Sequence, residues 1–218
     1  LTADGYGYEL ADGSAGVGVR RADSVTEALD PVTGRPAVIL DYWFDDEDHN
    51  GGVNGFAIFG TETKNSVVAS LASATYKGDA EIKFAPKAGF DDYGSKVSKI
   101  QGDVDMTANF GSGTVAGSIT ALQYQAPRLI DPTRSWTDID GSLALNTAKI
   151  DGNGFTGAVT ADAAFVENAG KVDSSSSYSG TFYGENADYA AGVLNLSGTS
   201  TADDAPTIGT GFWQGFKQ

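Results

Sequence analysis

Residues 178–196, Tyr-Ser-Gly-Thr-Phe-Tyr-Gly-Glu-Asn-Ala-Asp-Tyr-Ala-Ala-Gly-Val-Leu-Asn-Leu, contain two β-type runs that meet at a polar turn, Glu185–Asp188. The glycines Gly180, Gly184 and Gly192 occur where strands bend or where a backbone and an aromatic ring approach closely. The strand pattern and these glycines together predict a β-barrel. Because the stretch implies no catalytic group, we expect the barrel to have a binding role.

Strand-like runs of this kind recur from Ala74 onward, at intervals of roughly ten to fifteen residues with polar turns between them, which is typical of a sandwich or an up-and-down barrel. The predicted strands are 74–85, 102–110, 114–123, 141–150, 154–165, 178–184, 189–198 and 209–216. Many of them alternate cleanly, so that Val104, Met106, Ala108 and Phe110 share one face, which is buried. A barrel of this size is filled by side chains or holds at most one small ligand.

Seven large side chains are predicted to point into the barrel and fill it, which would leave ligand binding to the loops or to the N-terminal region. They are Phe84, Met106, Phe110, Phe155, Phe165, Phe182 and Trp213.

The first 71 residues differ in their sequence pattern from the rest of the chain. Short strands are expected at 6–8 and 17–20, and residues 37–60 are interpreted as a long hairpin whose strands flank an acidic turn. The segment 67–71 is predicted to link this region to the barrel.

Composition excludes several functions. The net charge of −15 makes nucleic acid a poor partner, because phosphate backbones require clustered cations. The absence of cysteine excludes disulfides and thiolate chemistry, and no apolar run is long enough to span a bilayer. Leu1 opens directly into polar sequence, as expected of a mature form from which an export signal or lipid anchor has been removed.

Enzyme motifs are missing from the sequence. There is a single histidine and no nucleophile elbow, phosphate-binding loop or paired-histidine metal motif. Paired carboxylates for glycoside chemistry stay an open alternative, because their separation in space is invisible in a sequence. We expect a protein that is not an enzyme.

Four segments carry a family resemblance: 76–80 (Tyr-Lys-Gly-Asp-Ala), 154–158 (Gly-Phe-Thr-Gly-Ala), 179–192 and 209–212 (Gly-Thr-Gly-Phe). In order and spacing they resemble the barrel of transferrin-binding protein B and related surface lipoproteins and haemophores. The resemblance covers roughly residues 74–218. It implies an all-β chain in which a small β-rich handle domain, residues 1–72, precedes an eight-stranded antiparallel up-and-down β-barrel domain, residues 73–218.

The function that the resemblance implies is non-enzymatic iron acquisition. Such a protein is secreted or held as a lipoprotein on the outer membrane of a Gram-negative bacterium, and it passes its cargo to an outer-membrane receptor. A chain with one handle and one barrel favours haem, or a haem- or iron-carrying protein, over transferrin itself. The alternatives are a surface adhesin or protein-binding module without a small ligand, and a purely structural surface protein.

The predicted binding residues begin at the hairpin tip. His49 could ligate haem or a transition metal, although a histidine in a polar turn is more often simply solvated. Asp46, Asp48 and Asn50 form the opening half of a calcium loop, but its closing acid is replaced by Ala57. An ordinary acidic turn is the alternative.

Aromatic and basic residues complete the predicted site. Tyr42, Trp43 and Phe44 either pack the handle against the barrel or form a contact surface or haem slot, since neighbours on a strand point to opposite faces. Tyr124 precedes the longest proline-bearing loop, and loops often carry binding. In that loop Arg128 and Arg134 could pair with haem propionates or with a partner's carboxylates, or with carboxylates of this chain.

Overall fold

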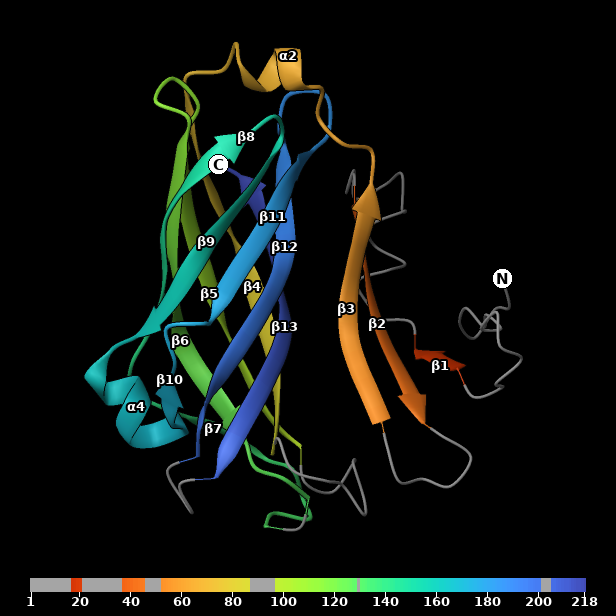
Figure 1. Ribbon diagram of the computed structural model, residues 1–218, viewed down its shortest axis with the longest axis vertical. Helices are drawn as coiled ribbons and strands as arrows, with labels where there is room; N and C mark the ends of the chain where they lie inside the picture. Colours follow the sequence, from red (N-terminus) through yellow and green to blue (C-terminus); the bar gives the residue numbers. More distant parts are fainter. Residues whose placement is uncertain (1–16, 21–36, 46–51, 87–96, 129, 201–204) are drawn as a thin grey trace.

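The computed structural model describes residues 17–20, 37–45, 52–86, 97–128, 130–200 and 205–218, and for residues 17–20, 37–45, 52–55 and 59 it describes the backbone alone. The described strands form two sheets that lie side by side (Figure 1). The smaller sheet has the order β1-β2-β3, with β1 at Val17–Arg20, β2 at Ala37–Asp45 and β3 at Gly52–Gly60. Asp45 pairs with Gly52, so the predicted hairpin over residues 37–60 is confirmed.

The larger sheet closes on itself as an eight-stranded antiparallel barrel, which confirms the predicted fold. Each barrel strand pairs with the next one along the chain, and β13 returns to pair with β4. The barrel strands are β4 (Ser73–Pro86), β5 (Ser98–Asn109), β6 (Thr114–Gln125), β8 (Leu143–Asp151), β9 (Gly154–Ala161), β11 (Ser177–Tyr183), β12 (Tyr189–Thr199) and β13 (Pro206–Lys217). Two short strands lie at its margin: β7 (Trp136–Asp138) pairs with β6, and β10 (Lys171–Val172) pairs with β12.

The barrel interior is filled by side chains, as the sequence predicts. Met106, Phe182 and Trp213 are fully buried within one continuous cluster that draws on all eight barrel strands. The polar tips of the large rings are satisfied by main-chain carbonyls: the Tyr76 hydroxyl donates to Ala187 O at 2.8 Å, and Trp213 Nε1 donates to Ser179 O at 3.0 Å. Burying these rings therefore leaves no donor without a partner.

The glycines of the 178–196 stretch make room for Trp213. A Cβ at Gly180 would lie 2.3 Å from Trp213 Cζ2, and a Cβ at Gly192 would lie 1.7 Å from Ser179 O and 2.6 Å from Trp213 Nε1. The two glycines pair directly across β11 and β12. The indole therefore occupies space that side chains at these two positions would otherwise take.

One predicted strand is shorter than expected, and a helix follows it. β9 ends at Ala161, and Phe165 lies in α4 (Ala163–Ala169) rather than on the strand. Asp162 caps the helix, since its side chain accepts from Phe165 N at 2.8 Å. Phe165 is buried in the barrel core all the same.

The link between the two sheets is bonded to the barrel. Thr63 N donates to Phe182 O at 2.9 Å, its hydroxyl donates to Gly184 O at 2.7 Å, and Glu62 bridges to Tyr183. The short helix α2 (Asn65–Val68) then leads into β4 and buries Val68 in the core. The predicted linker at 67–71 is therefore partly helical.

β3 also packs its face on the outside of β12 and β13 (Figure 1). The ring of Phe56 lies edge-on to Phe212, with centroids 5.2 Å apart, and Lys83 Nζ lies 4.9 Å from the Phe56 centroid. Ile58 packs against the cluster of Phe56 and Phe212 and also against the cluster that contains Tyr189. In the described part of the chain, no helix has the length and apolar character required to cross a membrane.

Candidate functional site

The candidate site begins at the loop that follows β6. Asp131 fixes this loop, because its carboxylate accepts from Thr133 N and Ser135 N, each at 2.9 Å, and from the Thr133 hydroxyl. The hydroxyl bond from Thr133, followed by these amide bonds, holds the pKa of Asp131 below its usual value. The turn at residues 131–135 is thereby organised without help from a partner.

A second clamp ties the end of the loop back to β6. Arg134 Nε and Nη2 donate to Gln125 Oε1 at 2.9 and 2.6 Å, and Gln125 Nε2 donates to Arg134 O at 2.7 Å. Arg134 adopts a φ of 53°, which this bonding stabilises. Arg134 thus pairs with an amide of this chain, and two of its five N–H groups are used in shaping the loop.

The clamped loop presents one apolar and one basic side chain to solvent. Ile130 is 73% exposed, the most exposed large apolar side chain among those the structure describes. Arg128 is exposed nearby, on the same loop. An exposed apolar and an exposed charged side chain next to a turn held by internal hydrogen bonds are suited to protein contacts.

This loop lies at the end of the barrel where β2 ends and β3 begins (Figure 1). We call that end, with the loop at residues 126–135 and the strand ends at Asp45 and Gly52, the loop end. Tyr42, Trp43 and Phe44 lie close to it on β2, paired with residues 55, 54 and 53 of β3. The fold therefore brings two of the predicted segments, far apart in sequence, to one end of the molecule.

The remaining predicted residues have different outcomes. His49, Asp46, Asp48 and Asn50 lie outside the described residues, so haem or calcium binding by them stays a prediction. Tyr124 is half-buried against the barrel core, where burial raises its pKa and a hydrogen bond with Ser98 opposes that rise. Within the described residues, no three His, Cys, Asp or Glu side chains are grouped as a metal site would require.

Beside the loop, the outer surface of β4, β5, β6 and β7 forms two ordered rows of cross-strand neighbours, which we call the β4–β7 wall. Strand register aligns Lys83, Lys99, Gln125 and Trp136 in one row. It aligns Glu81, Gln101, Gln123 and Asp138 in the other. Neighbours in such rows are close enough to bond directly.

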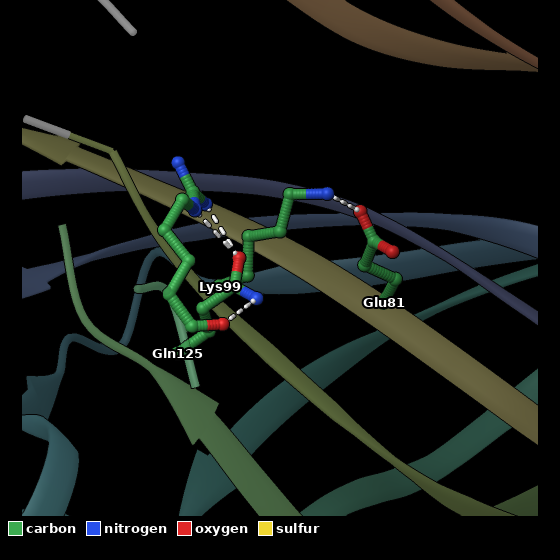
Figure 2. Close-up of polar contacts among 4 residues, drawn as sticks. Glu81, Lys99 and Gln125 are labelled. Atoms are coloured by element: carbon green, nitrogen blue, oxygen red, sulfur yellow. Dashed lines mark hydrogen bonds and ion pairs between the residues drawn. The ribbon is translucent and has the colours of Figure 1, made fainter. Parts of the chain in front are cut away.

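Direct contacts join the two rows to each other and link members of the second row. Lys99 Nζ in the first row lies 2.9 Å from Glu81 Oε1 in the second, and Figure 2 shows this pair next to Gln125. Gln101 Nε2 donates to Gln123 Oε1 at 2.6 Å, and Gln123 Nε2 donates to Asp138 Oδ1 at 2.7 Å. Sequence reasoning missed this wall, although its polar residues alternate with the buried ones on β5 and β6.

A shallow cavity of about 290 Å³ opens in the wall next to the contact between β3 and the barrel. Phe212, which packs against Phe56, is one of its walls, and Gln101 and Gln123 form another. Asp79, Glu81 and Asp103 make the lining acidic.

These features define the class of protein: a closed β-barrel whose interior is filled by side chains, with a second sheet on its flank. A family model described as the C-lobe and N-lobe beta barrels of Tf-binding protein B matches residues 68–211. The chain belongs to this family, which is one of binding proteins rather than enzymes.

Solved structures agree with that assignment at the level of the fold. The chain is similar to two structures of variants of the vaccine antigen transferrin binding protein B from Haemophilus parasuis Hp5, each with a TM-score of 0.50 and 19% sequence identity. The match covers 84% of this chain and 33% of each of those chains, so this chain spans about a third of their length. No curated protein matches the sequence.

Proposed function

We propose that this chain is a non-enzymatic binding protein that captures an iron-carrying protein at its loop end. In this proposal it acts at the surface of a Gram-negative bacterium, anchored by lipid or released, and passes the cargo to an outer-membrane receptor. The two Haemophilus parasuis structures are of a transferrin binding protein, and a serum or haem carrier protein is the corresponding partner here.

The observation that carries the proposal is the contrast between the barrel's two surfaces. The interior is packed with rings whose polar tips are satisfied, and this favours a macromolecular partner over a ligand held inside the barrel. At the loop end, by contrast, Ile130 and Arg128 are exposed next to a turn, residues 131–135, that internal hydrogen bonds hold in place. A turn that is already held in place costs little conformational entropy on binding, which favours recognition of a folded protein.

Binding of immobilised transferrin and haemoglobin, in their iron-loaded and iron-free forms, tests the proposal. We expect saturable binding of one of these carriers, weakened about tenfold or more by Arg128→Glu and by Ile130→Ala, because central interface residues carry most of the binding energy. Lys149→Glu is the control for Arg128→Glu, because it makes the same charge change at an exposed position near the C-terminal end of β8. It should leave binding unchanged. If none of these carriers binds, capture of an iron carrier is wrong and an adhesin becomes the better account.

Direct haem capture is the second candidate. The position of β2 favours it, because Tyr42 and Phe44 lie at the end of β2 from which residues 46–51, which include His49, lead to β3. A hemin titration should then give a saturable Soret shift at one equivalent that His49→Ala removes. A shift that persists in His49→Ala would transfer the ligand role to a tyrosine, and the absence of a saturable shift would eliminate direct haem binding.

A further inference from the structure

The β4–β7 wall carries a fixed pattern of hydrogen-bonding groups beside an exposed indole. From it we propose that this wall binds a neutral, hydroxyl-rich ligand: a sugar unit of a glycan, seated in the cavity that Gln101 and Gln123 line, with Trp136 contacting the next unit. The site is on the barrel wall rather than at the loop end. It does not depend on the identity of the carrier protein.

The carboxylate at the end of the second row fixes the direction of its hydrogen bonds. Asp138 can only accept, so Gln123 must present its NH₂ group to it across 2.7 Å. This turns the Gln123 carbonyl oxygen toward Gln101, which must therefore donate, across 2.6 Å. Both amides are thereby held in one orientation before any ligand arrives.

The hydrogen-bonding groups that these contacts leave unused include both donors and acceptors. Gln101 retains its carbonyl oxygen and one N–H, Gln123 retains one N–H, and Asp138 retains its second oxygen, and the described part of the chain supplies no further partner to them. A cation would require only acceptors and an anion only donors. A sugar hydroxyl both donates and accepts, so adjacent hydroxyls match this mixed set.

An irregularity in the strands produces the cavity. The register between β5 and β6 shifts between Gln101 and Asp103, and Ala121, on the bulged strand, adopts a φ of 50°. A Cβ at Gly102 would lie 2.7 Å from Leu122 Cδ2 and from Thr120 O, so the glycine lets the two strands approach there. Bulges and strained residues of this kind are found at binding sites, where they shape the surface.

The size and charge of the cavity further limit the kinds of ligand that it can hold. A volume of about 290 Å³ is near the lower limit for small-molecule sites, which suits a single sugar ring. Asp79, Glu81 and Asp103 line the cavity, where Glu81 is paired with Lys99 and Asp79 accepts from Gln214 Nε2 at 2.8 Å. The carboxylate of Asp103 would repel an acidic sugar, so the proposed ligand is neutral.

Trp136 provides the apolar contact. Its side chain is 37% exposed, and its position pairs with Gln125 at the margin of the wall, adjacent to the paired Gln123 and Asp138. A large, rigid and partly exposed ring is a suitable platform for the apolar face of a sugar ring.

Saturation-transfer difference NMR and calorimetry with mannose, galactose, N-acetylglucosamine and N-acetylneuraminic acid test the proposal. We expect at least one of the three neutral sugars to bind and N-acetylneuraminic acid not to bind. Gln123→Leu, which removes the central link of the chain of bonds, should weaken binding about tenfold. Trp136→Ala should weaken a disaccharide of the binding sugar more than the monosaccharide.

Gln218→Leu makes the same substitution at an exposed position at the other end of the barrel and should bind sugar as the parent chain does. Because Trp136 is at the surface, its variant also tests the wall if Gln123→Leu fails to fold. The proposal is overturned if none of the neutral sugars binds, if the acidic sugar binds best, or if Gln123→Leu and Trp136→Ala both bind like the parent. Carrier-protein binding is measured separately, so either proposal can fail alone.

Discussion

Single residues decide whether this barrel can close around its largest side chain. Trp213 is fully buried, and the space for its indole exists because Gly180 and Gly192 have no Cβ. The positions of the two glycines and of Trp213 can be read from the sequence. That the glycines make room for the indole becomes clear only when β11, β12 and β13 are paired.

Gly192→Ala is predicted to destabilise the barrel severely, by about 3 kcal/mol or more, because the new Cβ would lie 1.7 Å from Ser179 O and neither main chain can move freely in the sheet. Urea denaturation followed by tryptophan fluorescence measures the change. Gly111→Ala is the matched control, since the nearest atom to its Cβ would be Asn109 Oδ1 at 3.5 Å. Equal stability of the two variants would contradict the assigned packing of Trp213.

Buried tyrosines predict how stability depends on pH. Burial raises the pKa of Tyr178 and of Tyr183 to about 12 from the ordinary 10, with Glu62 adding to the rise at Tyr183. The folded state thus holds these protons more tightly than the unfolded chain. The stability that these two tyrosines contribute through their raised pKa values is fully present below pH 10 and is lost as the pH rises from 10 through 12.

Denaturation midpoints measured between pH 8 and 12 should therefore fall above about pH 10. Tyr178→Phe removes one titrating group and also its 2.7 Å bond to Asn146 O. The variant should be less stable by about 1 kcal/mol at neutral pH and should lose stability less steeply in alkali. A parent chain whose stability stays constant up to pH 12 would exclude this linkage.

At the scale of elements, the linker behaves as a short extension of the barrel's rim. Thr63 is buried and bonds through its amide to Phe182 O and through its hydroxyl to Gly184 O. Thr63→Val keeps the shape but leaves the Gly184 carbonyl without that donor, and we expect a loss of about 1–2 kcal/mol in the free energy of unfolding. Thr156→Val, on the exposed side of β9, should change stability by less than about 0.5 kcal/mol. Similar losses in both variants would show that the linker bond contributes nothing.

The strands were predictable because alternation survives along most of them. On β5 the buried positions 104, 106 and 108 alternate with exposed ones, as predicted from their apolar side chains. α4 was missed because Val159 and Phe165 suggest a continuing strand, whereas Asp162 caps a helix by bonding to the amide of Phe165. A capping aspartate before an alanine pair was the available signal.

The two candidate binding surfaces were predictable only in part. The sequence indicated that the loop at residues 126–135 would carry binding, because of its length and its prolines. The Arg134–Gln125 clamp and the row from Gln101 to Asp138 were not predictable, since both depend on strand register. The bulge at Ala121 shifts that register by one residue, and such a shift exchanges the two faces of a strand.

At the scale of the whole molecule, the barrel core draws on the barrel's own elements. Among the side chains that the structure describes, all members of the main buried cluster come from Val68 onward, while the three-stranded sheet contributes Phe56 and Ile58 to small clusters on the outer wall. The division into a handle domain of residues 1–72 and a barrel domain of residues 73–218 stays a prediction, and the fragments below would test it.

A fragment of residues 61–218 is predicted to unfold cooperatively, because it retains every pairing that closes the barrel and the rim bonds of Thr63. It should self-associate more than the full chain, since losing β3 uncovers Phe212, Val193 and Phe216. A fragment of residues 1–205 is the control: it lacks β13, which pairs with both β12 and β4 and carries Trp213, so it should show no cooperative transition. Thermal unfolding and light scattering measure both properties. If residues 61–218 melt without cooperativity, the three-stranded sheet and the barrel form one folding unit, and the contact of Phe56 with Phe212 stabilises the barrel rather than only attaching the sheet to it.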